Sequence, residues 1–171
     1  MMSDVVVYGM GGHGKVLIDL VHDSGLKILG VFDDKLKKGS VVKGYKVLGG
    51  ISELIEYKVQ CDNVILGIGS NNARKDVYLK LKLALFNFPV LVHSSSIISP
   101  LTVIDEGSVV LPGVVISNEV TIGTGCIVNA NATIDHNSTV GSFCHIGLSS
   151  VVTSHSNVKD LDFLTHGAVL L

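Results

Sequence analysis

Residues 122–146 read IGTGCIVNANATIDHNSTVGSFCHI, and an aliphatic residue returns in this stretch at every sixth position. An α-helix repeats about every 3.6 residues and a β-strand about every two, so neither element produces this spacing. A period of six is typical of a triangular β-solenoid, in which each side of a coil is one short strand. The aliphatic residue then points into the prism, and the stretch predicts a stack of three-sided coils.

The same spacing extends through the second half of the chain. Its aliphatic positions are Ile98, Ile104, Val110, Ile116, Ile122, Val128, Ile134, Val140, Ile146, Val152, Val158, Leu164 and Leu170. A small residue stands four positions after most of them and permits a corner; these are Thr102, Ser108, Val114, Cys126, Ala132, Ser138, Cys144, Ser150, Ser156 and Ala168. The pattern predicts a left-handed parallel β-helix of about four coils.

The composition limits the partners and the compartment. The chain has 171 residues, of which 47% are hydrophobic and 5% aromatic, and its net charge is −2. Without a basic stretch, nucleic acid is not an expected partner, and no apolar run is long enough to cross a membrane. Three cysteines without metal-ligand spacing favour a reducing cytoplasm. Cys126 and Cys144 are expected to stack on successive coils, where a disulfide is geometrically conceivable but buried, free thiols are the favoured interpretation.

The first half of the chain alternates apolar runs with helical patterns. The expected strands are Val5–Tyr8, Ile28–Phe32, Val64–Ile68 and Val90–Val92. One helix is expected after the first strand and another over about Arg74–Phe86. This alternation implies a small parallel sheet with ligands at the carboxyl ends of its strands. We therefore expect an α/β, Rossmann-like nucleotide-binding unit over residues 1–92 and the β-helix over residues 93–171.

A glycine-rich turn joins the first strand to the first helix. Gly9, Gly11 and Gly14 match the spacing of dinucleotide-binding turns, and Asp33 and Asp34 follow about twenty residues later. Backbone amides at a helix start can hold phosphate, and the acids could bind a ribose hydroxyl or a base N–H. Taken alone the turn suggests NAD, although the unit lacks a second mononucleotide-binding half. A tight turn with solvated acids is the other interpretation.

The combination of a glycine-turn α/β unit and a β-helix of six-residue repeats resembles the bacterial sugar acetyltransferases of the PglD and NeuD type. PglD acts on a UDP-4-amino sugar and NeuD on sialic acid. The resemblance covers nearly the whole chain, and it rests on Tyr8–Lys15, Phe32–Asp34, Gly69–Lys75, Val92–His93, Ile98–Pro100, Ile134–His136 and Gly141–Ile146. The Gly-His-Gly turn and the two histidines in the β-helix are the most specific of these segments.

The resemblance implies that the α/β unit holds a nucleotide sugar. By resemblance, the substrate-binding residues are Gly11, Gly12, His13, Gly14, Asp33, Asp34, Gly69, Asn71 and Arg74. The glycine turn would contact the phosphates or the sugar on both sides, and the two aspartates would recognise the uridine. Arg74 would clamp a phosphate or a carboxylate, because its guanidinium matches both in geometry.

The resemblance also implies that the β-helix binds acetyl-CoA and carries the catalytic base. The base falls on His136, while His145 and Asn129 would face the acetyl group. A neutral imidazole would remove a proton as an amine or hydroxyl attacks the thioester, and no metal is needed. Asn137 stands where the family usually has an acid, so we expect a weaker base or a carboxylate from a neighbouring subunit.

The repeat separates the two histidines. His136 comes two residues after the inward Ile134, and His145 comes directly before the inward Ile146, so they are expected at different corners. One side of the prism is about 16 Å wide. The two rings should therefore meet only across a threefold interface, which predicts a homotrimer with active sites between subunits.

These observations lead to one expected function and its alternatives. We expect an acetyl-CoA-dependent N-acetyltransferase of a UDP-linked 4-amino-4,6-dideoxy sugar in bacterial surface-glycan biosynthesis. An O-acetyltransferase of sialic acid or a related sugar is the closest alternative. A non-catalytic nucleotide-sugar-binding protein is a third, because family members continue with CoA-binding coils beyond the position of Leu171. An NAD-dependent enzyme is the most distant.

Overall fold

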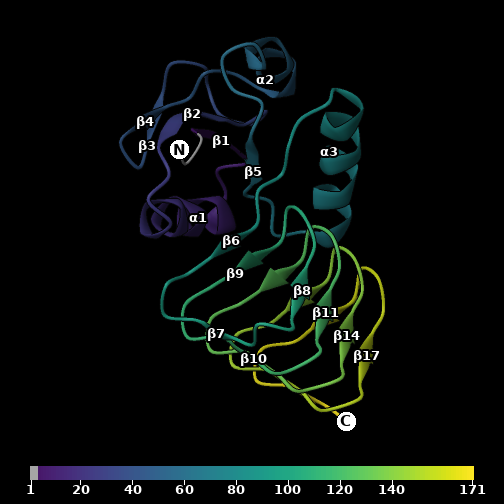
Figure 1. The fold of residues 1–171 in the computed structure, drawn as a ribbon. Helices are drawn as coiled ribbons and strands as arrows, with labels where there is room; N and C mark the ends of the chain where they lie inside the picture. Colours follow the sequence, from purple (N-terminus) through teal and green to yellow (C-terminus); the bar gives the residue numbers. More distant parts are fainter. Residues whose placement is uncertain (1–3) are drawn as a thin grey trace. The chain divides into compact units, whose positions relative to one another are not determined.

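The computed structural model describes residues 4–171, which divide into two compact units, residues 4–89 and residues 90–171 (Figure 1). Residues 1–3, which belong to the expected first domain, lie outside the described residues. Between residues 4 and 171, no helix is long and apolar enough to cross a membrane.

The first unit is built on a parallel sheet in the order β2-β1-β5. Its strands are β1 (Val5–Tyr8), β2 (Ile28–Phe32) and β5 (Val64–Leu66), and its helices are α1 (Gly12–Asp23), α2 (Ile51–Tyr57) and α3 (Asn71–Leu83). A short antiparallel pair, β3 (Val41–Val42) and β4 (Tyr45–Lys46), follows β2. Every residue of the central β1 is buried, which explains its uninterrupted apolar sequence.

Two parts of this unit differ from the expected elements. Helix α3 begins at Asn71, earlier than the expected Arg74, because the Ser70 hydroxyl accepts a hydrogen bond from the Ala73 amide and caps the helix. Helix α2 was not expected, although Glu53 accepts a hydrogen bond from the Gly50 amide at its start. Its seven residues are too few for a clear helical period.

The expected placement of the strand at Val90–Val92 in the first sheet was wrong. The structure forms β6 at Leu91–Val92 and pairs it in parallel with β9 (Val109–Val110) of the second unit. Val92 lies six residues before Ile98, so it continues the six-residue spacing one step earlier. The inward position of Val92 in the repeat therefore decides which sheet this strand joins.

The second unit is a parallel β-helix made of three sheets. Sheet 1 contains β7 (Ile97–Ile98), β10 (Val115–Ile116), β13 (Thr133–Ile134), β16 (Val151–Val152) and β19 (Val169–Leu170). Sheet 2 contains β8 (Val103–Ile104), β11 (Thr121–Ile122), β14 (Thr139–Val140) and β17 (Asn157–Val158). Sheet 3 contains β6, β9, β12 (Ile127–Val128), β15 (His145–Ile146) and β18 (Phe163–Leu164). The chain visits the three sheets in turn and completes about four coils, as the sequence predicts.

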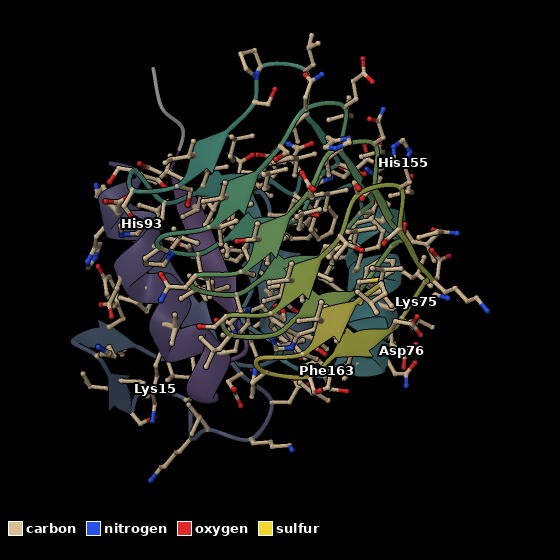
Figure 2. All side chains as sticks on the ribbon, turned by 90° about the horizontal axis from the view of Figure 1, so that it is seen from below. Lys15, Lys75, Asp76, His93, His155 and Phe163 are labelled. Carbon is tan, nitrogen blue, oxygen red and sulfur yellow. The ribbon has the colours of Figure 1, made fainter. Side chains whose placement is uncertain are left out.

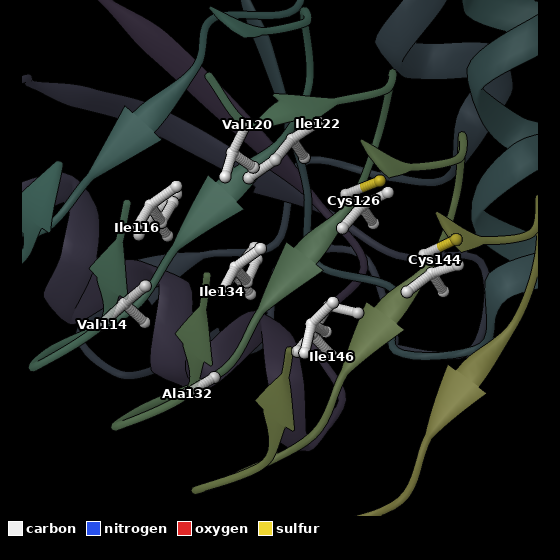
Figure 3. Close-up of a cluster of buried hydrophobic side chains, with 14 residues drawn as sticks. Val114, Ile116, Val120, Ile122, Cys126, Ala132, Ile134, Cys144 and Ile146 are labelled. Carbon is white, nitrogen blue, oxygen red and sulfur yellow. The ribbon is translucent and has the colours of Figure 1, made fainter. Parts of the chain in front are cut away.

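The core of the β-helix consists of the aliphatic residue from each strand and a small residue from each corner (Figure 3). Ile116 and Ile134 pair across successive coils and are both almost completely buried. Cys126 and Cys144 occupy equivalent corners as free, buried thiols, which confirms the expectation. Each thiol donates to a carbonyl oxygen of the next coil at 2.9 Å, Cys126 to Gly141 and Cys144 to Lys159.

The corners contain residues in the left-handed backbone region, which favours glycine. Glycines fill part of the two columns of corners that flank sheet 3, at Gly107, Gly113, Gly125 and Gly167. The column between sheets 1 and 2 has none; it contains Glu119, Asn137 and His155, with φ of 55°, 57° and 59°. We call these three residues the polar column.

Candidate functional site

A cavity of about 320 Å³ lies at the carboxyl ends of β1, β2 and β5. Gly9 and Gly11 follow β1, Asp33 and Asp34 follow β2, and Gly69 follows β5. All five line the cavity. The structure thus brings the glycine turn, the aspartate pair and the loop after β5 together, at the edge where parallel sheets bind ligands.

The glycines of the turn have two different roles. A Cβ at Gly14 or Gly67 would collide with the backbone oxygen of Gly9, so these positions allow the helix, the turn and β5 to approach closely. A Cβ at Gly11 or Gly12 would meet no atom within 4 Å. Gly11 is the N-cap of α1 and supplies no side-chain cap. The first-turn amides of a helix have no partner within the helix, which suits them to a phosphate.

Both aspartates brace the loops around the cavity. The Asp33 carboxylate accepts from the backbone amides of Met10 at 2.7 Å and Lys35 at 2.8 Å. The Asp34 carboxylate accepts from the Tyr8 hydroxyl and from the Ile51 amide, each at 2.7 Å. Burial raises the pKa of Tyr8, and the neighbouring Asp34 carboxylate raises it further. The predicted contact of these aspartates with a base remains a prediction, and their positions are already fixed by these bonds.

Arg74 lies inside the first unit, with an exposed fraction of only 1%. Its guanidinium donates to the carbonyl oxygens of Ile68 at 3.0 Å and Gly69 at 3.1 Å, and to the Asn71 side-chain oxygen at 2.8 Å. A buried guanidinium requires such acceptors. The contacts favour a structural role, in which Arg74 holds the loop after β5, over the direct phosphate clamp expected from the sequence. His13 approaches the same loop, since a Cβ at Gly69 would lie 3.7 Å from the His13 Cβ.

His136 lies in the turn between sheets 1 and 2, as expected. Its Nδ1 lies 2.8 Å from the Asn137 side-chain oxygen, and the Asn137 side-chain nitrogen donates to Glu119 at 2.7 Å. The Asp135 carboxylate lies 4.0 Å from Nε2 of the same ring and accepts from the His136 backbone amide. That backbone bond lowers the pKa of Asp135. The His155 ring meets the His136 ring edge-on, with centroids 5.4 Å apart.

Glu119 was missed in the sequence. The sequence led us to expect a weaker base or a carboxylate from a neighbouring subunit; in the structure, Glu119 of the preceding coil accepts a hydrogen bond from the Asn137 side chain. The signal that could have identified it is its spacing: Glu119 stands 18 residues before Asn137, which is one coil of the repeat. Residues one coil apart stack in a β-helix, as Ile116 and Ile134 do.

Asn129 and His145 form a second polar group on the β-helix. The Asn129 side-chain nitrogen lies 3.1 Å from Nε2 of His145. His145 is the outward residue of β15 in sheet 3, so its expected place at a corner was wrong. The reason is that the strand includes the residue before each inward aliphatic residue. The Phe163 ring lies beside His145, with centroids 4.8 Å apart.

The structure places the two histidine groups on different parts of the β-helix. His136 lies at the corner between sheets 1 and 2, whereas His145 lies on sheet 3. Figure 2 shows the labelled neighbours of each group, His155 and Phe163, on different sides of this unit. His136 pairs instead with Asn137, a residue of the polar column.

Comparisons with known proteins agree with these observations. Residues 4–81 match the PglD N-terminal domain. The chain is 33% identical over 113 residues to the UDP-N-acetylbacillosamine N-acetyltransferase of Bacillus subtilis (strain 168). That match covers 64% of this chain and 52% of that protein, so the chain spans about half the length of this curated relative.

Two solved structures resemble the chain over both units. PerB from Caulobacter crescentus, in complex with CoA and GDP-perosamine, is 25% identical with a TM-score of 0.88, and the match covers 98% of this chain and 88% of PerB. The acetyltransferase domain of PglB from Neisseria gonorrhoeae FA1090, in complex with acetyl coenzyme A, is 25% identical with a TM-score of 0.83. That match covers 100% of this chain and 92% of the PglB domain. The resemblance to PglD-like sugar acetyltransferases is confirmed.

Proposed function

We propose that this protein is an acetyl-CoA-dependent N-acetyltransferase of a nucleotide-linked amino sugar, of the UDP-4-amino-4,6-dideoxy type, in bacterial surface-glycan biosynthesis. The observation that carries the proposal is the geometry of His136. Its Nδ1 is held by the Asn137 side chain, which leaves Nε2 to act on a substrate. This histidine belongs to a chain that resembles sugar acetyltransferases over both of its units.

In the proposed reaction, Nε2 of His136 accepts a proton from the sugar amine as the amine nitrogen attacks the thioester carbonyl. The new C–N bond forms, the C–S bond breaks, and the CoA sulfur leaves as a thiol with the proton that the His136 imidazolium returns. The Asp135 carboxylate, 4.0 Å from Nε2, stabilises the imidazolium while the ring carries the extra proton. Asn129 and His145 are proposed to hold the acetyl group, because the Asn129 side-chain nitrogen lies 3.1 Å from Nε2 of His145.

The cavity of the first unit is proposed to hold the nucleotide. Gly11, Gly12 and His13 at the start of α1 would meet the phosphates, since the space beside both glycines is open. Asp33 and Asp34 line the same cavity and would contact the base. Gly14 and Arg74 would act indirectly, by holding the turn and the loop that shape the cavity.

A homotrimer is part of the proposal, because one chain separates the two histidine groups. Sheet 1 has an outward row of mainly aliphatic residues, made of Ile97, Val115, Thr133, Val151 and Val169. At its ends, Ile97 and Val169 are 69% and 57% exposed. An apolar row of this kind supports association with further copies of the chain. Three free cysteines favour the cytoplasm as its compartment.

The test is the release of thiol from acetyl-CoA in the presence of a UDP-4-amino-4,6-dideoxy sugar. The variant is His136→Ala, and the control is His22→Ala, which removes an exposed histidine of the first unit. We expect turnover to fall at least about 100-fold in His136→Ala and to persist in the control.

The other outcomes would decide between the alternatives. Equal turnover in both variants would refute His136 as the base. Turnover with sialic acid alone would indicate O-acetylation. Absence of turnover in a chain that still binds the UDP sugar would indicate a protein that binds nucleotide sugars without catalysis.

A further inference from the structure

We infer that Glu119 is a positioning residue for His136 and acts through the Asn137 side chain. The inference rests on the proposed function, in which His136 is the base. It concerns three side chains in two successive coils: the Glu119 carboxylate, the Asn137 amide and the His136 imidazole.

The chemistry of the two hydrogen bonds allows only one arrangement. A carboxylate only accepts hydrogen bonds, so the Asn137 NH₂ group must face Glu119, at 2.7 Å. The Asn137 oxygen is then turned toward His136, 2.8 Å from Nδ1. This oxygen also only accepts, so Nδ1 must carry the ring proton. In the neutral ring Nε2 is then unprotonated, which is the form required of a base.

Without the Glu119 carboxylate, the amide of Asn137 would have two usable orientations. After a rotation of about 180° it would present its NH₂ group to Nδ1, and the ring proton would move to Nε2. A histidine in that form cannot accept a proton at Nε2. Glu119 therefore selects the tautomer of His136 without touching the ring, as the outer residues of other histidine sites do.

The side chains of the polar column are a second observation in favour of this role. Glu119, Asn137 and His155 adopt the left-handed region, as Asn131, Phe143, Ser149 and Leu161 do at the other corners. What distinguishes the polar column is that its side chains converge on His136. Glu119 reaches it through Asn137, Asn137 contacts its Nδ1, and the His155 ring meets it edge-on, with the ring centroids 5.4 Å apart.

The other charged neighbour of the ring does not fix its tautomer. The Asp135 carboxylate lies 4.0 Å from Nε2, which is too far for a hydrogen bond, and it accepts from the His136 backbone amide. Asp135 can stabilise a positive charge on the ring, whereas the Asn137 side chain sets the position of its proton.

A reversal of the hydrogen-bond polarity tests the inference. Glu119→Gln keeps the size of the side chain but permits the rotated form of Asn137. Asn137→Asp places a second carboxylate against Glu119, and the two repel each other. The double variant Glu119→Gln/Asn137→Asp restores the order of donors and acceptors, because the new aspartate accepts from both His136 and the glutamine. Glu106→Gln, at the corner between sheets 2 and 3, is the matched control.

The first readout is the tautomer of His136, measured from the ¹⁵N chemical shifts of its ring in the full chain without substrates. We expect protonated Nδ1 to predominate in the wild type, in the control and in the double variant, and protonated Nε2 to increase in Glu119→Gln. The second readout is turnover. We expect kcat to fall about 10-fold in Glu119→Gln with unchanged KM, and to recover in the double variant.

The two readouts separate the failure of this inference from that of the proposed function. An unchanged tautomer in Glu119→Gln, or a double variant no better than its parents, would overturn the role of Glu119. A shifted tautomer and its rescue, in a chain that never turns over, would uphold the role of Glu119 and refute the proposed function.

Discussion

The two units hold their polar side chains in different ways. In the first unit, Arg74 is buried and both Asp33 oxygens accept from backbone amides, so the cavity is shaped by bonds between side chains and main chain. In the β-helix, His136 and Asp135 are 47% and 44% exposed, and the bonds around the ring join side chains of successive coils. The side chains around the cavity of the first unit therefore also hold its loops in place. The side chains around His136 lie on the surface of the β-helix, outside its hydrophobic core.

The substitution expected to have the largest effect is Gly14→Ala, because its Cβ would collide with the Gly9 backbone and no side-chain rotation can relieve the clash. We expect a loss of more than about 3 kcal/mol in the free energy of unfolding, together with loss of nucleotide-sugar binding. Thermal unfolding and binding titrations would measure both. The control is Gly12→Ala, where the space is open and stability should be retained. Equal stability of the two variants would contradict the close approach at Gly14.

An intermediate effect is expected in the β-helix core from Ile134→Ala. This residue is fully buried between Ile116 and Val152, so the variant should lose about 2–5 kcal/mol. Its neighbour Thr133 points outward from the same strand, and Thr133→Ala should change stability by less than about 1 kcal/mol. Urea unfolding of both variants measures the difference. If Thr133→Ala cost as much as Ile134→Ala, the assignment of inward and outward positions would fail.

The smallest effect is expected from Tyr8→Phe, which removes the hydrogen bond to Asp34. We expect a loss of about 1 kcal/mol at neutral pH. The pKa of Tyr8 is raised in the folded state, so its contribution is complete below about pH 10 and declines as the pH rises further. The stabilities of the wild type and the variant should therefore converge above about pH 10. A constant difference across that range, measured against Tyr57→Phe as a control, would show that Tyr8 is not buried against Asp34.

The β-helix could be predicted from its sequence because every strand of every coil needs an aliphatic residue at its inward position. An inward aliphatic residue every six positions is enough to set the register, and every expected position from Ile98 to Leu170 faces the core or packs against it. Val92 follows the same rule, but it was assigned to the first sheet because it follows an α/β pattern. Helix α2 and the β3–β4 pair were missed because their segments are too short to show a period.

The candidate sites could be predicted only in part. The positions of His136 and Asn129 follow from the resemblance and the repeat, but their partners depend on the stacking of coils. Glu119 is distant from His136 in the sequence and adjacent to Asn137 only through the 18-residue step. Arg74 was expected to clamp a phosphate or a carboxylate, and the carbonyl groups that accept from it are not visible in a sequence.

The 18-residue step also limits how a gene for this protein can change in length. Duplication of one whole coil keeps every strand in its sheet, whether the new coil enters before, within or after the polar column. A coil of unrelated sequence inserted between Glu119 and Asn137, however, would move the carboxylate away from the amide by about 4.8 Å, the spacing of neighbouring strands. A copy inserted after His155 would leave that pair in contact. A coil inserted after His155 thus leaves the surroundings of His136 unchanged. An unrelated coil inserted between Glu119 and Asn137 breaks the hydrogen bond that holds the Asn137 side chain.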